Sequence, residues 1–424
     1  MKKLLFSSIL LGLGTLSMIA QSGTKSPYSQ YGLGILSDQS QGFNRGMSGL
    51  FQGIRNGNQV NMQNPASYSA VDSLSMIFDA AVSGQFTQFK EGNAKINAKT
   101  ANFEYATALF RVLPKFGVSL GIVPYTNIGY DFTTVEKVVD SSLSALTDYE
   151  GSGGLHQVYI GLGFELFKGF SLGANMSYLW GGYERSVLAF SSEDDASSLY
   201  KGYNTDISSY KLDIGAQYRQ RLSKYDVLTV GATFGLGHKL GDDAVMTIRN
   251  MNLSVGDTTK ITNAFALPTS IGGGFTVNHK NSLTIGADYL LQRWSAVDHP
   301  MTNPKTGKYE LMSGFYKDRH KVTVGADWIP DRMARGFFKR VHYKVGASYA
   351  TPYYKINGQD GPKEITVSAG LGIPLVNAWN NRSTLNVSFQ WVNQSAKNLI
   401  TDNTFRVTIG LTFNERWFAK WKVE

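Results

Sequence analysis

The sequence contains no cysteine among its 424 residues. This absence excludes disulfide bonds, thiolate metal sites, thiol nucleophiles and a lipoprotein anchor. The six histidines are scattered, and no two have the i,i+4 spacing of a helical zinc motif. Charged residues are also few, at 17% of the chain. We therefore expect no bound metal, no cofactor and no catalytic residues, and we expect the protein not to be an enzyme.

Long apolar runs are missing as well. Beyond residue 20, no run approaches the roughly 18–20 apolar residues that a membrane-spanning helix needs. A transmembrane β-barrel needs no such run, because each strand exposes only alternate residues to lipid. The net charge is +9. We place this excess on solvated loops and rims, and the alternative is that it attracts anionic lipid or lipopolysaccharide head groups. The sequence has no basic stripe with interleaved aromatic residues, so we expect no nucleic-acid partner.

The most regular stretch is LTIGADYLL at 283–291, in which every second residue is apolar. A period of two places one apolar and one polar face on an extended strand. The pattern returns several times along the chain, as LGANM at 172–176, IGAQY at 214–218, VGATF at 230–234, VGADW at 324–328 and VGASY at 345–349. Repetition through most of the chain predicts an all-β protein, a transmembrane antiparallel barrel of about 14 strands.

Connection lengths support this prediction. The candidate strands are 75–90, 98–113, 116–138, 154–168, 170–190, 206–222, 226–240, 266–279, 281–294, 315–330, 342–356, 363–376, 383–394 and 403–415. Short connections tend to alternate with longer ones, as in a barrel with tight turns on one side and surface loops on the other. An even strand number would place both chain ends on the tight-turn, periplasmic side.

Four segments are predicted. Residues 1–20 resemble a cleaved signal peptide, with Lys2 and Lys3 before an apolar core, although an uncleaved anchor is the alternative. Residues 21–74 are rich in Gly, Ser, Asn and Gln but too apolar for a solvated linker, so we expect a plug inside the barrel mouth. Residues 75–415 form the barrel. Residues 416–424 form a short periplasmic tail, either frayed or in contact with the membrane or a partner through its aromatic residues.

Two motifs suggest enzymatic chemistry, but both have simpler explanations. GVSLG at 117–121 matches the G-x-S-x-G pattern, yet Ser119 lies within a candidate strand instead of on the required strand-to-helix turn. Several carboxylates occupy the lumen-facing side of the repeats and could form an acid/base pair. We instead predict a structural polar network in the lumen, made of Asp213, Asp288, Asp327, Arg219, Lys344 and Arg406.

One short motif carries more information. In Asn64-Pro65-Ala66, proline fixes its own φ and biases Asn64 towards an extended conformation, which predicts a rigid bend before the first strand. Together with the leader, the Gly-rich segment and about fourteen strands, this motif resembles the FadL/TodX-type outer-membrane transport family. VPYTNIGYDF at 123–132 is similar to a Pro-Tyr-rich third-strand region of that family, and SPYSQYGLG at 26–34 resembles the mature N-terminus of related Gram-negative barrels of uncertain cargo.

The resemblance implies a fourteen-stranded, plugged barrel in the outer membrane that takes up hydrophobic molecules such as long-chain fatty acids. It implies that cargo leaves after the plug shifts or through a kink in a strand. Asn64, Pro65 and Ala66 carry over as the plug motif. Candidate cargo contacts in the plug are Phe43, Met47, Leu50 and Phe51, which could equally be packing residues. The alternative function is a structural or accessory barrel subunit of an outer-membrane assembly or secretion complex, with a protein partner.

Overall fold

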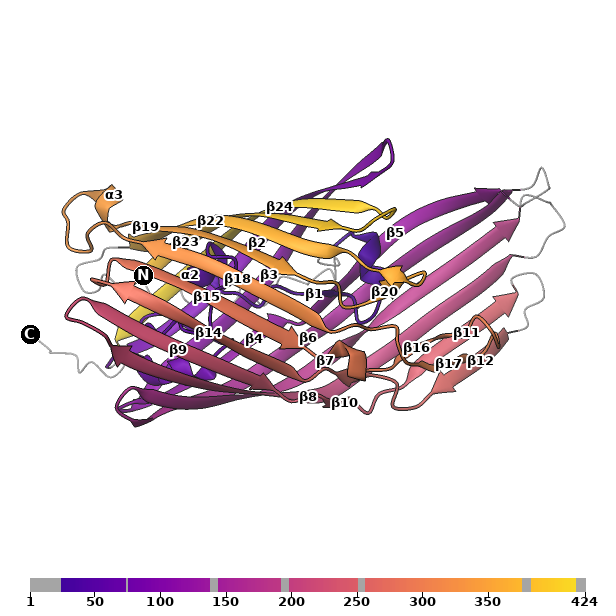
Figure 1. Ribbon diagram of the computed structural model, residues 1–424. Coiled ribbons are helices and arrows are strands. Elements are labelled where there is room, and N and C mark those ends of the chain that lie inside the picture. Colours follow the sequence, from indigo (N-terminus) through magenta and orange to yellow (C-terminus); the bar gives the residue numbers. More distant parts are fainter. Residues whose placement is uncertain are drawn as a thin grey trace, which may run out of the picture.

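The computed structural model describes residues 24–73, 75–137, 144–191, 198–250, 256–375 and 383–416. Fourteen antiparallel strands form a closed barrel wall, with β4 and β5 following one another at a single position (Figure 1). The wall strands are β2 (Ser75–Glu91), β3 (Ala94–Leu113), β4 (Phe116–Pro124), β5 (Thr126–Lys137), β6 (Ser144–Phe167), β7 (Phe170–Ser191), β8 (Leu199–Arg221), β9 (Asp226–Gly235), β14 (Ser270–His279), β15 (Leu283–Gln292), β18 (Arg319–Trp328), β19 (His342–Ala350), β22 (Lys363–Leu375), β23 (Ser383–Ser395) and β24 (Thr401–Arg416). The pairing of β2 with β24 closes the barrel.

The period of two in the sequence corresponds to the two faces of the wall. On β23, Phe389 and Trp391 point outward and are exposed, whereas Ser388 and Gln390 are buried on the lumen side. The same division holds across pairs, since outward Ile285 of β15 lies opposite Ala326 of β18. The outer face therefore carries apolar side chains and the inner face polar ones, which is the arrangement expected of a barrel in lipid. The prediction of an all-β barrel of about 14 strands is confirmed.

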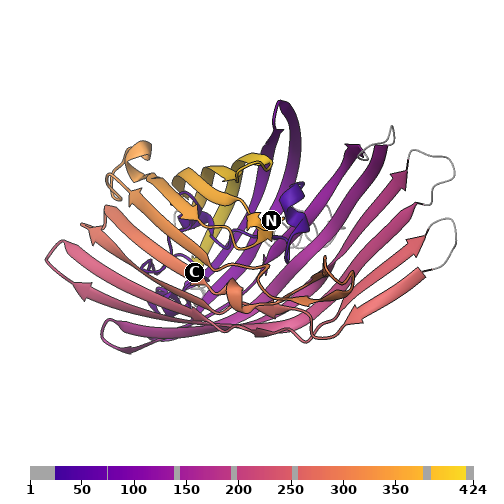
Figure 2. The ribbon, with the colours of Figure 1, turned by 45° about the vertical axis from the view of Figure 1, so that its right-hand side comes forward.

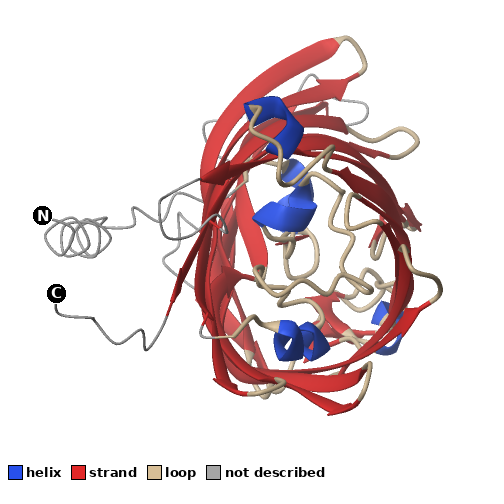
Figure 3. Cartoon of the chain, turned by 90° about the vertical axis from the view of Figure 1, so that its left-hand side faces the viewer, coloured by secondary structure: helices blue, strands red, loops and turns tan. Residues whose placement is uncertain are grey.

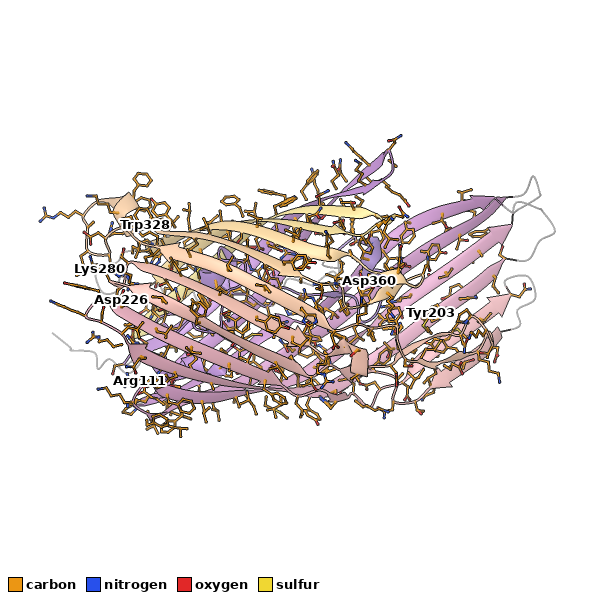
Figure 4. All side chains as sticks on the ribbon, in the orientation of Figure 1. Arg111, Tyr203, Asp226, Lys280, Trp328 and Asp360 are labelled. Carbon is orange, nitrogen blue, oxygen red and sulfur yellow. The ribbon has the colours of Figure 1, made fainter. Side chains whose placement is uncertain are left out.

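The two ends of the barrel differ. Short turns lie at one end, and the longer connections lie at the other (Figure 1). Arg111, Asp226, Lys280 and Trp328 mark the tight-turn end, and Tyr203 and Asp360 lie towards the long-loop end (Figure 4). The turn between β14 and β15 places Lys280 and Asn281 at φ 55° and 52°. The paired residues His279 and Leu283 are joined by only three residues, and positive φ at Lys280 and Asn281 lets the chain reverse within them.

Several expected boundaries need correction. The candidate strand 116–138 is divided into β4 and β5, and the candidate strand 154–168 starts ten residues earlier as β6. The expected loops 241–265 and 295–314 contain strand pairs, because local hairpins satisfy their backbone groups. The additional strands are β10 (His238–Lys239), β11 (Ala244–Asn250), β12 (Gly256–Ile261), β13 (Ala266–Leu267), β16 (His299–Thr302), β17 (Tyr309–Met312), β20 (Lys355–Ile356) and β21 (Gln359–Asp360).

Residues 24–73 lie inside the ring of strands, together with parts of the loops (Figure 3). This segment contains η1 (Pro27–Gln30), β1 (Ile35–Leu36), α2 (Gly42–Arg45) and η2 (Pro65–Ala70). Two further short helices, η3 (Trp294–Ala296) and α3 (Phe337–Arg340), lie in connections between wall strands. Among the described residues, no helix is long and apolar enough to cross a bilayer. The predicted leader 1–20 and all but the first residue of the predicted tail 416–424 lie outside the described ranges.

Candidate functional site

The barrel wall is interrupted where β4 ends and β5 begins. β4 pairs with both β3 and β6, and its last residue, Pro124, lies opposite His156. Proline has no N–H to donate to a neighbouring strand, so it favours the end of a ladder. Tyr125 follows, outside both strands, and its N–H donates to the carbonyl oxygen of Leu155 at 2.7 Å. Beyond this point, β5 continues along β6 alone on that side.

Among the described residues, only part of β3 is paired with β4. Its pairing with β4 stops at Ala106, and the residues before that position pair only with β2. Among the described residues, the edge of β5 that would face β3 pairs instead with β1 of the plug segment, with Leu36 opposite Thr126. The β2–β3 hairpin diverges from β5 in both side views (Figures 1 and 2). The ladder of the wall is therefore interrupted between β3 and β5 among the described residues, and the plug segment pairs with the start of β5; we call this interruption the wall opening.

A β-bulge on β3 lies beside this opening. Ala81 pairs with Tyr105 and the next residue, Val82, pairs with Phe103, so Glu104 is the extra residue. A bulge redirects the side chains around it, and here both Glu104 and Tyr105 are buried in the lumen. Glu104 forms an ion pair with Arg45 of α2, with 2.7 Å between Nη1 and Oε2. The bulge thus places a carboxylate where the plug supplies a guanidinium.

Arg45 is fully buried and links three parts of the lumen. Besides Glu104, its Nη2 donates to the carbonyl oxygens of Ser40 at 2.8 Å and Asp38 at 3.1 Å. Burial alone would raise the pKa of the Asp38 carboxyl, but the positive charges of Arg45, Lys321 and Arg406 outweigh this effect and hold its pKa below the ordinary value. The plug and the wall are therefore joined by a small set of opposite charges away from bulk water.

Two polar anchors on other strands hold the next turn of the plug. The Asp288 carboxylate on β15 accepts the backbone N–H groups of Phe51 at 2.6 Å and Gln52 at 3.0 Å. On β22, the Ser368 hydroxyl accepts the N–H of Ser48 at 2.7 Å. These bonds satisfy backbone donors that would otherwise be buried without a partner, which is costly. The plug backbone is consequently bound to two wall strands, β15 and β22, that are separated by β18 and β19.

The glycine repeated in the strand motifs forms the seat of the plug. A Cβ added at Gly346 would lie 2.3 Å from the carbonyl carbon of Met47, and one at Gly173 would lie 2.4 Å from the carbonyl carbon of Pro65. The corresponding glycines of the other motifs lie equally close to plug or wall atoms: Gly215, Gly231, Gly286 and Gly325. Only a residue without a side chain permits this approach of two backbones. The repeats therefore encode a contact surface in addition to strand alternation.

The Asn64-Pro65-Ala66 motif lies at this seat. Asn64 precedes η2 in an extended conformation, and its side chain accepts the N–H of Ala66 at 3.3 Å. Its Nδ2 donates to the carbonyl oxygen of Gln52 at 3.0 Å. All three residues of the motif are buried. The motif thus caps a short helix and connects two sections of the plug, just before β2.

The candidate cargo contacts occupy two environments. Phe43, Met47 and Leu50 form a buried apolar cluster with Ile54, packed towards the glycine seat. Phe51 lines an internal cavity. As contacts for a cargo molecule, all four positions stay a prediction.

The six residues predicted as a lumen network belong to separate groups. Five of them have close partners: Asp213 with Lys211, Asp288 with the Phe51 and Gln52 amides, Asp327 with His342 at 3.0 Å, Lys344 with Asn386 at 3.3 Å, and Arg406 with Asp38 at 3.7 Å. The side chain of Arg219 is exposed near the turn end of β8. The structure therefore brings Asp327 and Lys344 together, as facing residues of β18 and β19, but not the whole set of six. Ser119, from the hydrolase-like motif, is buried in β4 and donates to the carbonyl oxygen of Ala108 at 2.8 Å.

This internal cavity measures about 190 Å³ and lies beside the wall opening. It is lined by plug residues 24–26 and 35–39, by the part of β3 that precedes Ala106, and by the opposite wall. Its lining includes the charged side chains Asp38, Glu104, Asp288, Arg319, Lys321, Glu364, Asp402 and Arg406. Sites for drug-sized ligands are usually larger, at about 300–1,000 Å³, and mostly apolar. The cavity in this conformation is thus small and polar.

A cluster of buried aromatic side chains lies among the loops at the long-loop end. Trp294 is fully buried, with its ring centroid 5.2 Å from that of Tyr316 and 5.0 Å from that of Tyr353. His299 stacks on Phe315 at 4.2 Å and contacts the Tyr316 hydroxyl through Nδ1 at 3.2 Å. Plug residues Tyr28 and Leu33 belong to the same cluster. We call this cluster the aromatic cap; it joins the start of the plug to the loops.

Sequence reasoning missed the residues that hold the plug most firmly, Arg45 and Glu104. A signal was present, because each is a lone charge among apolar neighbours, in GFNRGM and NFEYATALF. It also missed the role of the repeated glycines and the interruption at Pro124, although proline inside a strand pattern argues against an uninterrupted central strand.

Comparisons with known proteins agree with this architecture. The family model described as BamG matches residues 1–424. No curated protein matches the chain. Among solved structures, a Pseudomonas aeruginosa FadL homologue is 12% identical, with a TM-score of 0.62 over 90% of this chain and 99% of its own. The P. putida toluene transporter TodX is 12% identical, with a TM-score of 0.61 over 91% and 100%. The Ralstonia pickettii toluene transporter TbuX is 14% identical, with a TM-score of 0.59 over 88% and 97%. At these identities the likeness shows the fold, which is that of the FadL/TodX-type channels, as expected from the sequence.

Proposed function

The chain belongs to the BamG family, and we propose that it is an outer-membrane barrel for passive uptake of hydrophobic small molecules through the opening in its wall. The single observation that supports the proposal is the interruption of the strand ladder between β3 and β5 among the described residues, beside which residues of β3 and Tyr125 line the internal cavity. The similarity in fold to channels whose names specify toluene or monoaromatic hydrocarbons supports the same class of cargo. Long-chain fatty acids are a second cargo class, proposed from the sequence.

The route needs a conformational change. In the described residues the aromatic cap packs among the loops at the long-loop end, and the glycine seat contacts the plug towards the other end. Cargo would pass the cap, displace the β1 segment from β5 and leave sideways between β3 and β5. The apolar side chain at this exit is Phe103, which is 39% exposed and also lines the cavity. Of the plug candidates, Phe51 is the one that cargo would meet in the cavity.

An uptake assay tests this proposal. Cells that lack other uptake routes would be supplied with labelled toluene or labelled fatty acid, with and without the protein. Phe103→Asp puts a charge at the exit and should reduce uptake, because a desolvated carboxylate opposes an apolar molecule. The matched control is Phe86→Asp, a residue of similar exposure on the outer face of β2 that does not line the cavity. Equal uptake by cells with and without the protein would rule out the transport proposal.

A second candidate function is favoured by a specific observation. The plug is fixed by a fully buried ion pair, by Asp288 and by close backbone contacts, and the cavity is small and polar. A plug that does not move suits a structural or accessory subunit of an outer-membrane assembly or secretion complex. Mild solubilisation with cross-linking would distinguish the two functions. A stoichiometric protein partner together with absent uptake supports the subunit, and uptake by the isolated barrel in vesicles supports the channel.

A further inference from the structure

The turn between β18 and β19 is the longest at its end among the turns that the structure describes. It reads DRMARGFFKR at 331–340 and contains the short helix α3. Three large apolar side chains are exposed on it, Met333 at 91%, Phe337 at 48% and Phe338 at 74%. Four basic residues accompany one acidic residue: Arg332, Arg335, Lys339 and Arg340, with Asp331. Exposed apolar side chains of this size in a basic segment mark an interaction surface. We call residues 331–340 the basic hairpin.

The basic hairpin has a defined conformation. The N–H of Asp331 donates to the carbonyl oxygen of Lys339 at 2.9 Å, and the N–H of Met333 donates to the Asp331 carboxylate at 2.9 Å. The Tyr343 hydroxyl of β19 donates to the carbonyl oxygen of Phe338 at 3.1 Å. These bonds hold the backbone while the apolar side chains remain in contact with the surroundings. The exposure is therefore built into the fold.

The position of the hairpin corresponds to the edge of a membrane. α3 projects outward from the wall at the tight-turn end (Figures 1 and 2), and Trp328 lies beside it (Figure 4). Trp328 and Tyr343 form a ring pair at 5.7 Å on the outer face, directly before and after the turn. Aromatic residues collect at the interface between lipid and water. The hairpin thus lies at the depth of lipid head groups.

An apolar groove of about 810 Å³ opens on the outer wall beside the hairpin. Its floor consists of small outward residues that face one another in register, with Ala326 opposite Val345 and Ala347 opposite Val367. Its walls are larger side chains, Phe275, Phe389, Trp391 and Phe405. Along β18, Ala326 lies two residues before Trp328, which corresponds to about 7 Å. The groove and the hairpin therefore lie on the same outer face of β18 and β19, with the Trp328–Tyr343 ring pair between them, apolar in the wall and basic at the turn.

We propose that this surface is a binding site for an anionic diacyl phospholipid of the periplasmic leaflet, with an acyl chain in the groove and the phosphate at the basic hairpin. The inference rests on the proposed outer-membrane location and not on transport. The combination of a basic turn, membrane-depth aromatic residues and an adjoining apolar groove matches the three parts of such a lipid: charge, interface and chain. A zwitterionic phospholipid satisfies the groove but leaves the net positive charge of the hairpin uncompensated.

Native mass spectrometry of the full-length, detergent-solubilised protein tests the proposal. The probes are dioleoyl phosphatidylglycerol and dioleoyl phosphatidylcholine, added at equal concentration. We expect the protein to retain phosphatidylglycerol preferentially. Arg335→Gln with Lys339→Gln should weaken phosphatidylglycerol binding roughly thirtyfold, at about fivefold for each cation removed near an anionic surface. Ala326→Leu with Ala347→Leu should fill the groove and weaken retention of both lipids.

Matched controls come from the same barrel. Lys168→Gln with Lys224→Gln removes two exposed cations from other tight turns, and Ala174→Leu enlarges an outward alanine on β7 that does not line the groove. Heat modifiability on a gel confirms that each variant is folded. Equal retention of the two lipids, or equal loss in the controls, would overturn the proposal. Unchanged lipid retention with loss of a co-purifying protein would also overturn it and assign the hairpin to a protein partner. Because these variants leave the β3–β5 opening intact, uptake failure is scored separately.

Discussion

Replacement of Arg45 by methionine should release the central part of the plug. The Arg45 side chain is fully buried, and its partner Glu104 is 7% exposed at an N–O distance of 2.7 Å. Removal of one member of a buried ion pair leaves an uncompensated charge and typically costs about 3–5 kcal/mol. The variant also loses the hydrogen bonds from Arg45 to Ser40 and Asp38. We expect the free energy of local plug opening to fall by about 3 kcal/mol or more.

Hydrogen exchange measures this opening directly. A fall of about 3 kcal/mol corresponds to more than a hundredfold faster exchange of the amides at 42–54, since each 1.4 kcal/mol is a factor of ten. Exchange in the strands of the opposite wall should not change. The double variant Arg45→Met with Glu104→Gln removes both charges and should recover much of the protection. If exchange in Arg45→Met stays within about threefold of the parent, or if the double variant exchanges as fast as the single one, the buried pair does not hold the plug.

Three further predictions concern the seat, the motif and the cap. Gly346→Ala would place a Cβ 2.3 Å from the carbonyl carbon of Met47, so it should displace Met47 and raise the protease sensitivity of the plug. The control Gly84→Ala has open space around it and should not raise this sensitivity. Equal protease sensitivity of the two variants would contradict the glycine seat. Asn64→Ala removes the cap of η2 and should lower the thermal unfolding midpoint, at a cost of about 1 kcal/mol, and an unchanged midpoint would argue against a capping role. Burial depresses the pKa of His299 to about 3, below its ordinary value of about 6.5 in an unfolded chain, so the aromatic cap should lose stability as the pH falls from about 6.5 towards 3. The protection of amides in the loop 294–316, taken relative to the intrinsic exchange rate at each pH, should therefore fall on acidification in the parent and much less in His299→Gln, and a pH-independent protection in the parent would refute this assignment.

The strands could be predicted because their physical determinant is local. Alternation such as Phe389, Gln390, Trp391 sets both the strand and its orientation, so sequence alone placed most wall strands within a few residues. The plug could be predicted from composition, since an apolar but aperiodic segment must pack against something. The wall opening was less accessible, because the apolar pattern continues through Tyr125 and only Pro124 marks the interruption.

The contacts inside the lumen depend on pairs that are distant along the chain. Arg45 meets Glu104 only because a bulge turns the latter inward, and bulges leave no strong trace in alternation. The glycine repeats were visible as small residues, but their role requires knowledge of which segment approaches them. For the same reason the aromatic cap, built from the plug start and several loops, could not be assembled from sequence.

A reversible cross-link between the plug and the wall tests the central claim most directly. The native chain has no cysteine, so Leu36→Cys with Thr126→Cys, a facing pair of β1 and β5, introduces the only thiols. If cargo leaves between β3 and β5 by displacing β1, oxidation of this pair should abolish uptake of a labelled hydrophobic compound, and a reductant should restore it. Uptake that is the same in the oxidised and reduced states would contradict the lateral route.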